Sequence, residues 1–227
     1  RLRFFIGDVR DKDRLQLAVD ECVNIIHTAA LKIVPSAEYN PFEYVKTNII
    51  GTQNLITCVL NNSRRMRGIR LIALSTDKAT APINLYGATK LTMEKLIIAA
   101  NNIRGEDGPK FSLVKYGNVA NSNGSVIPLF KRAKEQGLPM PITDLRMTRF
   151  WILLEEAVEF VMQSLNKMEG RETFIPDMPS FKVLDLARCF SDDYIEIGVR
   201  PGEKIHEEIE IGRSSEDNNI WMNKEYL

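Results

Sequence analysis

A short part of the sequence holds several side chains suited to acid–base chemistry. Thr76, Asp77 and Lys78 are consecutive, and Tyr86 and Lys90 follow them closely. The four-residue spacing of Tyr86 and Lys90 places both side chains on one face of a helix. A lysine ammonium beside a phenol lowers the pKa of the hydroxyl, so a tyrosine becomes a usable base near neutral pH.

The spacing of Tyr86 and Lys90 also occurs on ordinary amphipathic helices, so it does not identify an active site by itself. The context is more informative. The apolar run 68–74 is short, β-branched and bounded by Gly68, which predicts a buried strand of a parallel sheet. Ligands of open α/β sheets bind at the carboxyl ends of the strands. The polar residues leave this strand at that end, which favours an active site over a solvated ion pair in a loop.

Composition limits the class of protein. The 227 residues are 44% hydrophobic and 26% charged, as in a soluble globular chain with one domain or a domain and a small lobe. Lys plus Arg (30) balance Asp plus Glu (30), which argues against a nucleic-acid partner or a membrane surface. Cys22, Cys58 and Cys189 are widely spaced and odd in number, so we expect buried free thiols in a reducing compartment and no metal site. Without a signal peptide or a membrane-spanning run, we expect a cytoplasmic location.

The first half of the chain alternates between strand and helix patterns. We expect strands at 1–6, 23–26, 68–74 and 111–116, and helices at 11–20, 41–60 and 86–102. Asn40 and Pro41 suit the cap and first turn of the long helix. The alternation predicts an α/β fold, a Rossmann-like doubly wound parallel sheet with right-handed crossovers. His27 ends the second strand, where it is either a hydrogen-bonded core residue or a ligand.

Beyond Asn118 the elements become shorter and mixed. We expect a loop at 121–125, helices at 127–136, 155–167 and 184–190, strands at 140–143, 173–176 and 194–199, and a final helix near His206. We therefore divide the chain into a partial dinucleotide-binding domain at 1–120 and a mainly substrate-binding lobe at 121–227. The last dozen residues are polar, and we expect them to be loosely ordered.

Several stretches together carry a family resemblance. They are Phe4-Phe-Ile-Gly-Asp-Val-Arg-Asp11, His27-Thr-Ala-Ala-Leu-Lys32, Ser75-Thr-Asp-Lys78, Asn84-Leu-Tyr-Gly-Ala-Thr-Lys90, Tyr116-Gly-Asn-Val119, Met147-Thr-Arg-Phe-Trp151 and Arg200-Pro-Gly-Glu-Lys204. The chain resembles the extended short-chain dehydrogenase/reductase superfamily. Within it, the chain is similar to the inverting UDP-N-acetylglucosamine 4,6-dehydratases of the polysaccharide biosynthesis protein family. Larger membrane-bound relatives tend to carry Met at the position of Tyr86.

The sequence departs from that family in two places. The family begins with a strand and a glycine-rich turn that binds the cofactor pyrophosphate, whereas this chain starts at what resembles the third strand. We therefore expect the sequence to be partial, lacking a segment of about 50 residues, one and a half βαβ units. Relatives also carry Arg where this chain has Asn123, a change that bears on diphosphate affinity or substrate choice.

The resemblance implies a reaction. It is the NADP-dependent (or NAD-dependent) conversion of UDP-N-acetylglucosamine to a 4-keto-6-deoxy sugar nucleotide with inversion at C5, for flagellin or surface glycans. The implied catalytic residues are Tyr86 with Lys90 at the C4 hydroxyl, Lys78 as the base at C5, Asp77 as the acid at the C6 hydroxyl, and Thr76 at the C4 oxygen. The implied partners are the UDP-sugar and further copies of the chain in a homo-oligomer.

The resemblance also implies binding residues. Those for the cofactor are Asp8, Val9, Ala29, Ser75, Thr76, Tyr86 and Lys90. Those for the substrate are Lys32, Lys78, Asn118, Arg149, Arg200 and Glu203. The arginines and Glu203 suit the UDP end, because an Arg fork grips phosphate and a Glu accepts hydrogen bonds from uracil or ribose.

Two other functions compete with the dehydratase. A sugar-nucleotide 4-epimerase of the same superfamily needs Tyr86 and Lys90 but not Asp77 and Lys78. A non-catalytic fragment that binds sugar nucleotides is the alternative outside enzymology, because a chain without the glycine-rich turn lacks most pyrophosphate contacts. For the same reason we expect the isolated 227 residues to be poorly active.

Overall fold

The structure is a computed structural model, and it describes residues 2–222. The chain divides into two compact units. The first unit contains residues 2–75, 85–115 and 161–174, and the second contains residues 76–84, 116–160 and 175–222. Each unit therefore takes segments from distant parts of the sequence, and each is described by itself below.

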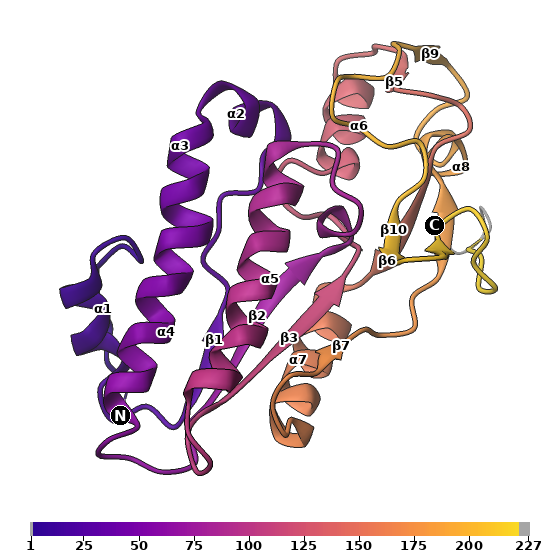
Figure 1. Cartoon of the computed structure of the whole chain (residues 1–227). Coiled ribbons are helices and arrows are strands. Elements are labelled where there is room, and N and C mark those ends of the chain that lie inside the picture. The colour runs from indigo at the N-terminus through magenta and orange to yellow at the C-terminus, as the bar shows by residue number, and fades with distance from the viewer. Residues whose placement is uncertain (1, 223–227) are drawn as a thin grey trace. The chain divides into compact units, whose positions relative to one another are not determined.

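The first unit is built on a four-stranded sheet in the order β1-β2-β3-β7 (Figure 1). The strands are β1 (Asn24–His27), β2 (Arg70–Thr76, whose last residue counts with the second unit), β3 (Lys110–Tyr116) and β7 (Thr173–Phe174). β1 is parallel to β2, and β3 is parallel to β7. The parallel sheet predicted from the alternating pattern is confirmed.

Helices connect these strands. They are α1 (Lys12–Val19), α2 (Val34–Tyr39), α3 (Pro41–Tyr44), η1 (Val45–Ile50), α4 (Gly51–Asn62) and α5 (Leu85–Ile103). The helix predicted over 41–60 is therefore one run from α3 to α4, with a π-helical stretch, η1, inside it. Asn40 occupies the cap position before Pro41, but its side chain makes no capping hydrogen bond. The short helix α2 was not predicted.

The core of the first unit lies between the sheet and the helices α4 and α5. Leu71 and Ala73 of β2 pack in one buried cluster with Val59 of α4 and Ile97 of α5. Ile72, which alternates with Leu71 and Ala73 along β2, is also completely buried. Because both faces of the strand are covered, its near-continuous apolar sequence is that of a parallel strand inside an α/β fold.

The strand predicted at 1–6 was wrong for the residues that the structure describes. Residues 2–7 have no regular structure, and Phe4 and Ile6 are almost fully exposed. A strand needs a neighbour to pair with, and the outermost strand of the sheet on this side is β1. Contacts from Arg14 hold the segment instead, since its Nε donates to the Ile6 carbonyl at 2.6 Å and its guanidinium lies over the Phe5 ring.

The second unit contains a three-stranded sheet in the order β4-β6-β8 and a pair of strands, β5 and β9. The elements are β4 (Asn118–Val119), α6 (Val126–Glu135), β5 (Met140–Ile142), β6 (Thr148–Ile152), β8 (Ser180–Lys182), α8 (Val183–Arg188) and β9 (Tyr194–Glu196). Helix α7 (Leu154–Lys167) belongs to this unit up to Phe160 and to the first unit from Val161.

Gly117 is required at its position, because a Cβ there would lie 2.5 Å from Cβ of Phe150.

The final helix expected near His206 was also wrong. This region forms a short antiparallel pair, β10 (Glu208–Glu210) and β11 (Arg213–Ser214). Ile209 is completely buried while Glu210 is exposed, which is the two-residue period of a strand. The end of the chain is better ordered than expected up to Met222, whose N–H donates to the Ser180 carbonyl; the rest of that stretch, 223–227, lies outside the described residues.

Other findings concern the cysteines and the helices. Cys22, Cys58 and Cys189 carry free thiols, but the expected burial was wrong for two of them, because Cys22 is partly buried and Cys189 is exposed. Among residues 2–222, none of the helices combines the length and the apolar character that crossing a bilayer requires.

Candidate active site

Tyr86 and Lys90 lie one turn apart at the start of α5 in the first unit, as predicted. Tyr86 is buried in a small cluster with Ala37 of α2 and Tyr44 of α3. The Lys90 amine is buried and donates to the Leu74 carbonyl near the end of β2 at 2.6 Å. Burial lowers the pKa of Lys90 to about 8, although the carboxylate of Glu94 opposes this effect. The amine can therefore hold or release a proton within a pH unit or so of neutrality.

A charged network lies next to Lys90 on the same helix. The carboxylate of Glu94 accepts a hydrogen bond from the Ser75 hydroxyl at 2.5 Å and is ion-paired with the Lys115 amine at 2.9 Å. All of these residues are buried. Glu94 thus fixes the Ser75 hydroxyl at the end of β2, and its negative charge acts on the Lys90 amine.

His27 is a core residue at the end of β1. Its Nε2 atom lies 3.0 Å from the Thr52 hydroxyl, and the ring is buried. Burial, with a smaller contribution from the charge of Lys90, lowers the pKa of His27 to about 4. The imidazole is therefore neutral near pH 7 and occupied in a hydrogen bond, which matches the hydrogen-bonded core alternative left open by the sequence.

The loop with Asp8 and Val9 is held against the start of α4. The Asn54 side chain donates to the carbonyls of Val9 and Arg10, and Val9 fits closely against Gly51, where a Cβ would lie 2.6 Å from its side chain. The exposed Asp8 carboxylate accepts hydrogen bonds from the Arg10 side chain and backbone, which lowers the pKa of Asp8 to about 2.

The loop after β1 contains Ala29 and Lys32, both exposed. Asn48 of η1 holds this loop, because its side chain accepts from the Leu31 N–H and donates to the Leu31 carbonyl, each at 2.9 Å. The same amide donates to the Thr89 hydroxyl on α5 at 3.0 Å. Asn48 therefore connects the loop to the helix of Tyr86 and Lys90, a role that the sequence did not indicate.

Thr76, Asp77 and Lys78 form a compact group in the second unit. Asp77 and Lys78 lie in a single turn, η2 (Asp77–Ala79), directly after β2. The Oδ1 atom of Asp77 accepts from the Thr76 hydroxyl at 2.8 Å and from the Lys78 amine at 3.1 Å. The Asp77 side chain is completely buried, and the Lys78 side chain is 23% exposed. The carboxylate and amine are thus a buried couple rather than a solvated loop ion pair.

A second carboxylate, that of Glu207, shares the Lys78 amine. Its Oε1 atom lies 3.3 Å from Lys78 Nζ and 3.9 Å from Arg149 Nε. Burial on its own disfavours the ammonium form, but the charges of Asp77 and Glu207 outweigh it, so the pKa of Lys78 is raised above its ordinary value. Glu207 was not predicted from the sequence. It lies two residues before Ile209, and the two-residue period of a strand would have placed its side chain on the same face as this apolar residue.

Several buried oxygens of the second unit have no hydrogen-bond partner among residues 2–222. They are Asp77 Oδ2, Asn118 Oδ1, Glu203 Oε2 and Glu207 Oε2, together with the hydroxyl of Ser125. A buried polar atom without a partner is costly, and such atoms in native proteins often bind a ligand or water. All of them are in position to accept hydrogen bonds.

Arg149 and Arg200 have different environments within this unit. The Arg149 guanidinium donates to the carbonyls of Thr148, Lys204 and Ile205, so its hydrogen bonds hold the segment that leads to Glu207. Arg200 is exposed, in a turn where the Glu203 N–H donates to its carbonyl. Its guanidinium is therefore accessible to an anion.

The structure divides the predicted residues between the two units. The first unit holds Asp8, Val9, Ala29, Lys32, Ser75, Tyr86 and Lys90, and the second holds Thr76, Asp77, Lys78, Asn118, Arg149, Arg200 and Glu203. Each group contains one acid–base couple, tyrosine with lysine in the first and aspartate with lysine in the second. Within the described residues there is no cluster of His, Cys, Asp or Glu that could hold a metal ion.

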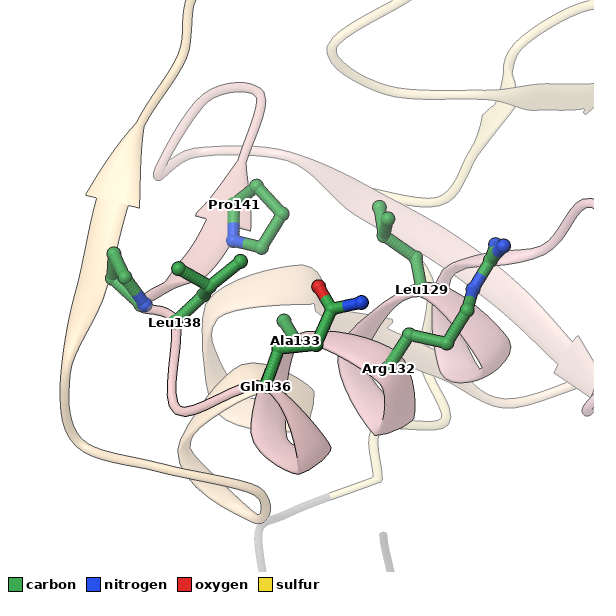
Figure 2. Close-up of a pocket in the computed structure, with 7 residues that line it drawn as sticks. Leu129, Arg132, Ala133, Gln136, Leu138 and Pro141 are labelled. Atoms are coloured by element: carbon green, nitrogen blue, oxygen red, sulfur yellow. The ribbon is translucent and has the colours of Figure 1, made fainter.

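A surface pocket occurs elsewhere in the second unit. It has a volume of about 470 Å³ and lies between α6 and the segment 138–141. Figure 2 shows labelled residues that line it, the apolar Leu129, Ala133, Leu138 and Pro141 and the polar Arg132 and Gln136. None of the residues predicted to act in chemistry lines this pocket, so it does not add to the candidate active site.

Comparisons with known proteins place this chain in a family. Residues 1–225 match the family model described as polysaccharide biosynthesis protein. A UDP-N-acetylglucosamine 4,6-dehydratase (inverting) of Campylobacter jejuni is 51% identical over 222 residues, which cover 96% of this chain and 64% of that protein. A UDP-glucose 4-epimerase of Rickettsia rickettsii is 37% identical and covers 92% of this chain and 62% of that protein.

A solved structure supports the fold. The X-ray structure of Pen from Bacillus thuringiensis superposes with a TM-score of 0.86 at 38% identity, over 92% of this chain and 66% of that one. This similarity, together with the parallel sheet of the first unit, establishes the Rossmann-like fold. The chain spans about 64% of the length of the curated dehydratase it matches.

Proposed function

The chain belongs to the polysaccharide biosynthesis protein family, and we propose that the protein carrying it dehydrates UDP-N-acetylglucosamine to a 4-keto-6-deoxy sugar nucleotide with inversion at C5. The observation that carries this proposal is the buried Asp77–Lys78 couple directly after β2. A dehydration needs both a base for carbon and an acid for the leaving hydroxyl, and this couple supplies one of each. The identity of 51% with a named inverting dehydratase supports the same conclusion.

The first unit fits a nicotinamide cofactor, NADP or NAD. The exposed, small Ala29 follows β1 and leaves the backbone accessible, and the buried Lys90 amine lies at the end of β2. Asp8, Val9 and Ser75 complete the residues that would hold it. When bound, a nicotinamide supplies reversible hydride transfer, which allows a C4 hydroxyl to become a ketone temporarily.

Tyr86 accepts the proton of the C4 hydroxyl in the proposed reaction. An ordinary tyrosine titrates near pH 10, so it needs a nearby positive charge to act as a base at neutral pH. Lys90 lies one helical turn away, and its pKa of about 8 leaves it mostly protonated near pH 7. The ketone formed at C4 then makes the proton on C5 acidic enough to remove.

Lys78 removes the C5 proton, and Asp77 protonates the departing C6 hydroxyl. In the resting pair the proton is on the lysine, whose pKa is raised. Its transfer across the 3.1 Å hydrogen bond to Asp77 Oδ1 produces a free amine and a carboxylic acid at once. One proton movement therefore prepares both groups. Thr76, which donates to the same oxygen, holds Asp77 in place or meets the C4 oxygen.

The remaining residues form the substrate end of the proposed site. Asn118 and Glu203 offer buried acceptor oxygens, and Arg200 offers an exposed guanidinium for the diphosphate. Lys32, in the first unit, is a further proposed substrate-binding residue. We propose a cytoplasmic location for the reaction. Because the family resemblance implies both, we also propose that the protein is a homo-oligomer and that the reaction is a step of flagellin or surface glycan synthesis.

The product of the intact protein tests the proposal. Purified protein is incubated with UDP-N-acetylglucosamine and NADP⁺ or NAD⁺ in D₂O, and the product is analysed by mass spectrometry and NMR. The expected product has lost water, carries a 4-keto group and holds deuterium at C5. Recovery of unchanged sugar from protein that binds the nucleotide would leave only the non-catalytic alternative.

The second candidate function is 4-epimerisation. The identity of 37% with a UDP-glucose 4-epimerase favours it, because this relative covers almost as much of the chain as the dehydratase does. Epimerisation requires Tyr86 and Lys90 but leaves the Asp77–Lys78 couple without a task. The same assay separates the two functions, since an epimerase yields a sugar of unchanged mass with no deuterium at C5.

A further inference from the structure

The Lys78 amine lies between two carboxylates, and only one of them follows from the family resemblance. Asp77 Oδ1 lies 3.1 Å and Glu207 Oε1 lies 3.3 Å from Nζ. The Glu207 side chain is 3% exposed, so its charge is almost completely removed from water. A buried carboxylate at this distance from a proposed catalytic amine affects where that amine lies and how firmly it holds its proton.

The backbone around Glu207 is fixed on two sides. Its N–H donates to the Ser215 hydroxyl at 3.0 Å, and its carbonyl accepts from the Ser215 N–H at 2.8 Å. The neighbouring Ile209 carbonyl accepts from the Thr80 hydroxyl, which ties β10 to the residue that follows η2. The Glu207 carboxylate therefore has a defined position relative to Asp77 and Lys78.

The charges that act on Lys78 come from three elements. Asp77 belongs to η2, Glu207 precedes β10, and Arg149, on β6, opposes them with a positive charge. The Glu207 Oε2 atom is buried and has no hydrogen-bond partner among residues 2–222, as is also true of Asp77 Oδ2. Both carboxylates thus keep one free oxygen for a ligand while they share one amine.

We propose that Glu207 is a positioning residue of the dehydration site: its carboxylate holds the Lys78 amine beside Asp77 and keeps the exchangeable proton on this pair. The inference rests on the function proposed above. Without Glu207, the Lys78 amine keeps Asp77 as its one remaining carboxylate partner of this pair, so it is held less firmly at the 3.1 Å distance across which the proton passes to Asp77. With Glu207, the proton stays available and passes between the two residues without leaving them.

A labelling experiment tests this inference without any substrate. Trace acetic anhydride modifies only the free amine, so the modification of Lys78 in the intact protein, quantified by mass spectrometry against pH, reports its proton affinity. Glu207→Gln keeps the size of the side chain and removes its charge. We expect its labelling curve to move to lower pH by about one unit or more. Glu210→Gln, at an exposed position of β10, should match the wild type.

The labelling curve of either Glu207 variant can contradict the proposal. An unchanged labelling curve in folded Glu207→Gln protein would overturn the proposal. If that variant does not fold, Glu207→Asp keeps the charge but withdraws it from the amine. A shift to lower pH in Glu207→Asp then supports the proposal, and a curve identical to the wild type contradicts it.

Turnover gives a second readout that separates this inference from the proposed function. In Glu207→Gln we expect C5 deuterium exchange to fall about tenfold or more at saturating substrate, with KM little changed, because the acid–base couple and not binding is affected. If wild-type protein performs no dehydration, the proposed function fails. The labelling result then still decides whether Glu207 holds the proton on Lys78.

Discussion

The hydroxyl of Ser75 donates a hydrogen bond of 2.5 Å to the carboxylate of Glu94. This bond joins the end of β2 to the helix of Tyr86 and Lys90, and the Lys115 amine of β3 meets the same carboxylate oxygen at 2.9 Å. One buried glutamate thus connects a sheet edge, a helix and a neighbouring strand of the first unit. The proposed cofactor-binding residues Ser75 and Lys90 both depend on it.

Replacement of Glu94 tests this connection. Glu94→Gln leaves the buried Lys115 ammonium without its carboxylate, so we expect the free energy of unfolding to fall by about 3 kcal/mol in urea titrations of the intact protein. Since Glu94 is the group that opposes the lowering of the Lys90 pKa, that pKa should fall below about 8. Glu135→Gln, at an exposed position of α6, is the control. Equal stability of the two variants would contradict the prediction.

Asn48 offers a second test of the same unit. Asn48→Ala leaves the partly buried N–H and carbonyl of Leu31 and the buried Thr89 hydroxyl without this amide. Each lost partner of a buried polar group costs about 1–3 kcal/mol. We expect a clear loss of stability by urea titration and weaker nicotinamide binding by calorimetry, because the loop with Ala29 and Lys32 is released. Gln53→Ala, at an exposed position of the following helix, should change neither quantity.

The pKa of His27 predicts a pH dependence of stability. The unfolded ring titrates near pH 6.5 and the folded ring near pH 4, so below pH 6.5 the unfolded chain binds a proton that the folded chain does not. The contribution of the neutral His27 ring to the free energy of unfolding is therefore fully present above pH 6.5. It is lost as the pH falls towards 4, by up to about 3 kcal/mol.

His27→Gln should remove this part of the pH dependence. The check is the difference in unfolding free energy between the wild type and this variant, measured by denaturant titration at several pH values between 7 and 4. We expect the difference to shrink as pH falls, because only the wild type carries the ring that resists protonation. A difference that stays constant over this range would show that the buried imidazole does not titrate as described.

Some parts of the fold and site follow from local sequence, and these were predicted. Tyr86 and Lys90 are one helical turn apart in any helix, and the short apolar run before Thr76 marks a buried strand. Both features depend only on residues near each other in the sequence. The group of Thr76, Asp77 and Lys78 was therefore found at the end of its strand.

Other parts depend on distant partners, and there the sequence alone was insufficient. Residues 2–7 have the composition of a strand, but pairing requires a neighbour, and composition does not provide one. Glu207 meets Lys78 only because the chain returns in β10 more than a hundred residues later. The alternation around Ile209 is typical of a strand, whereas our prediction for this region was a helix near His206.

Lys78→Ala is the most direct test of the dehydration couple. The variant removes the base while Tyr86 and Lys90 stay in place, so we expect C5 deuterium exchange in the intact protein to fall by about 10²–10⁴-fold. Asp77→Asn removes the acid instead, and it should prevent loss of water. In this variant Lys78 also loses one of its two carboxylate partners. Lys182→Ala, at an exposed position of the second unit, should retain full exchange. Exchange that persists in Lys78→Ala would exclude this amine as the base at C5. The proposed chemistry would then use only the Tyr86–Lys90 couple, and that couple is sufficient for epimerisation.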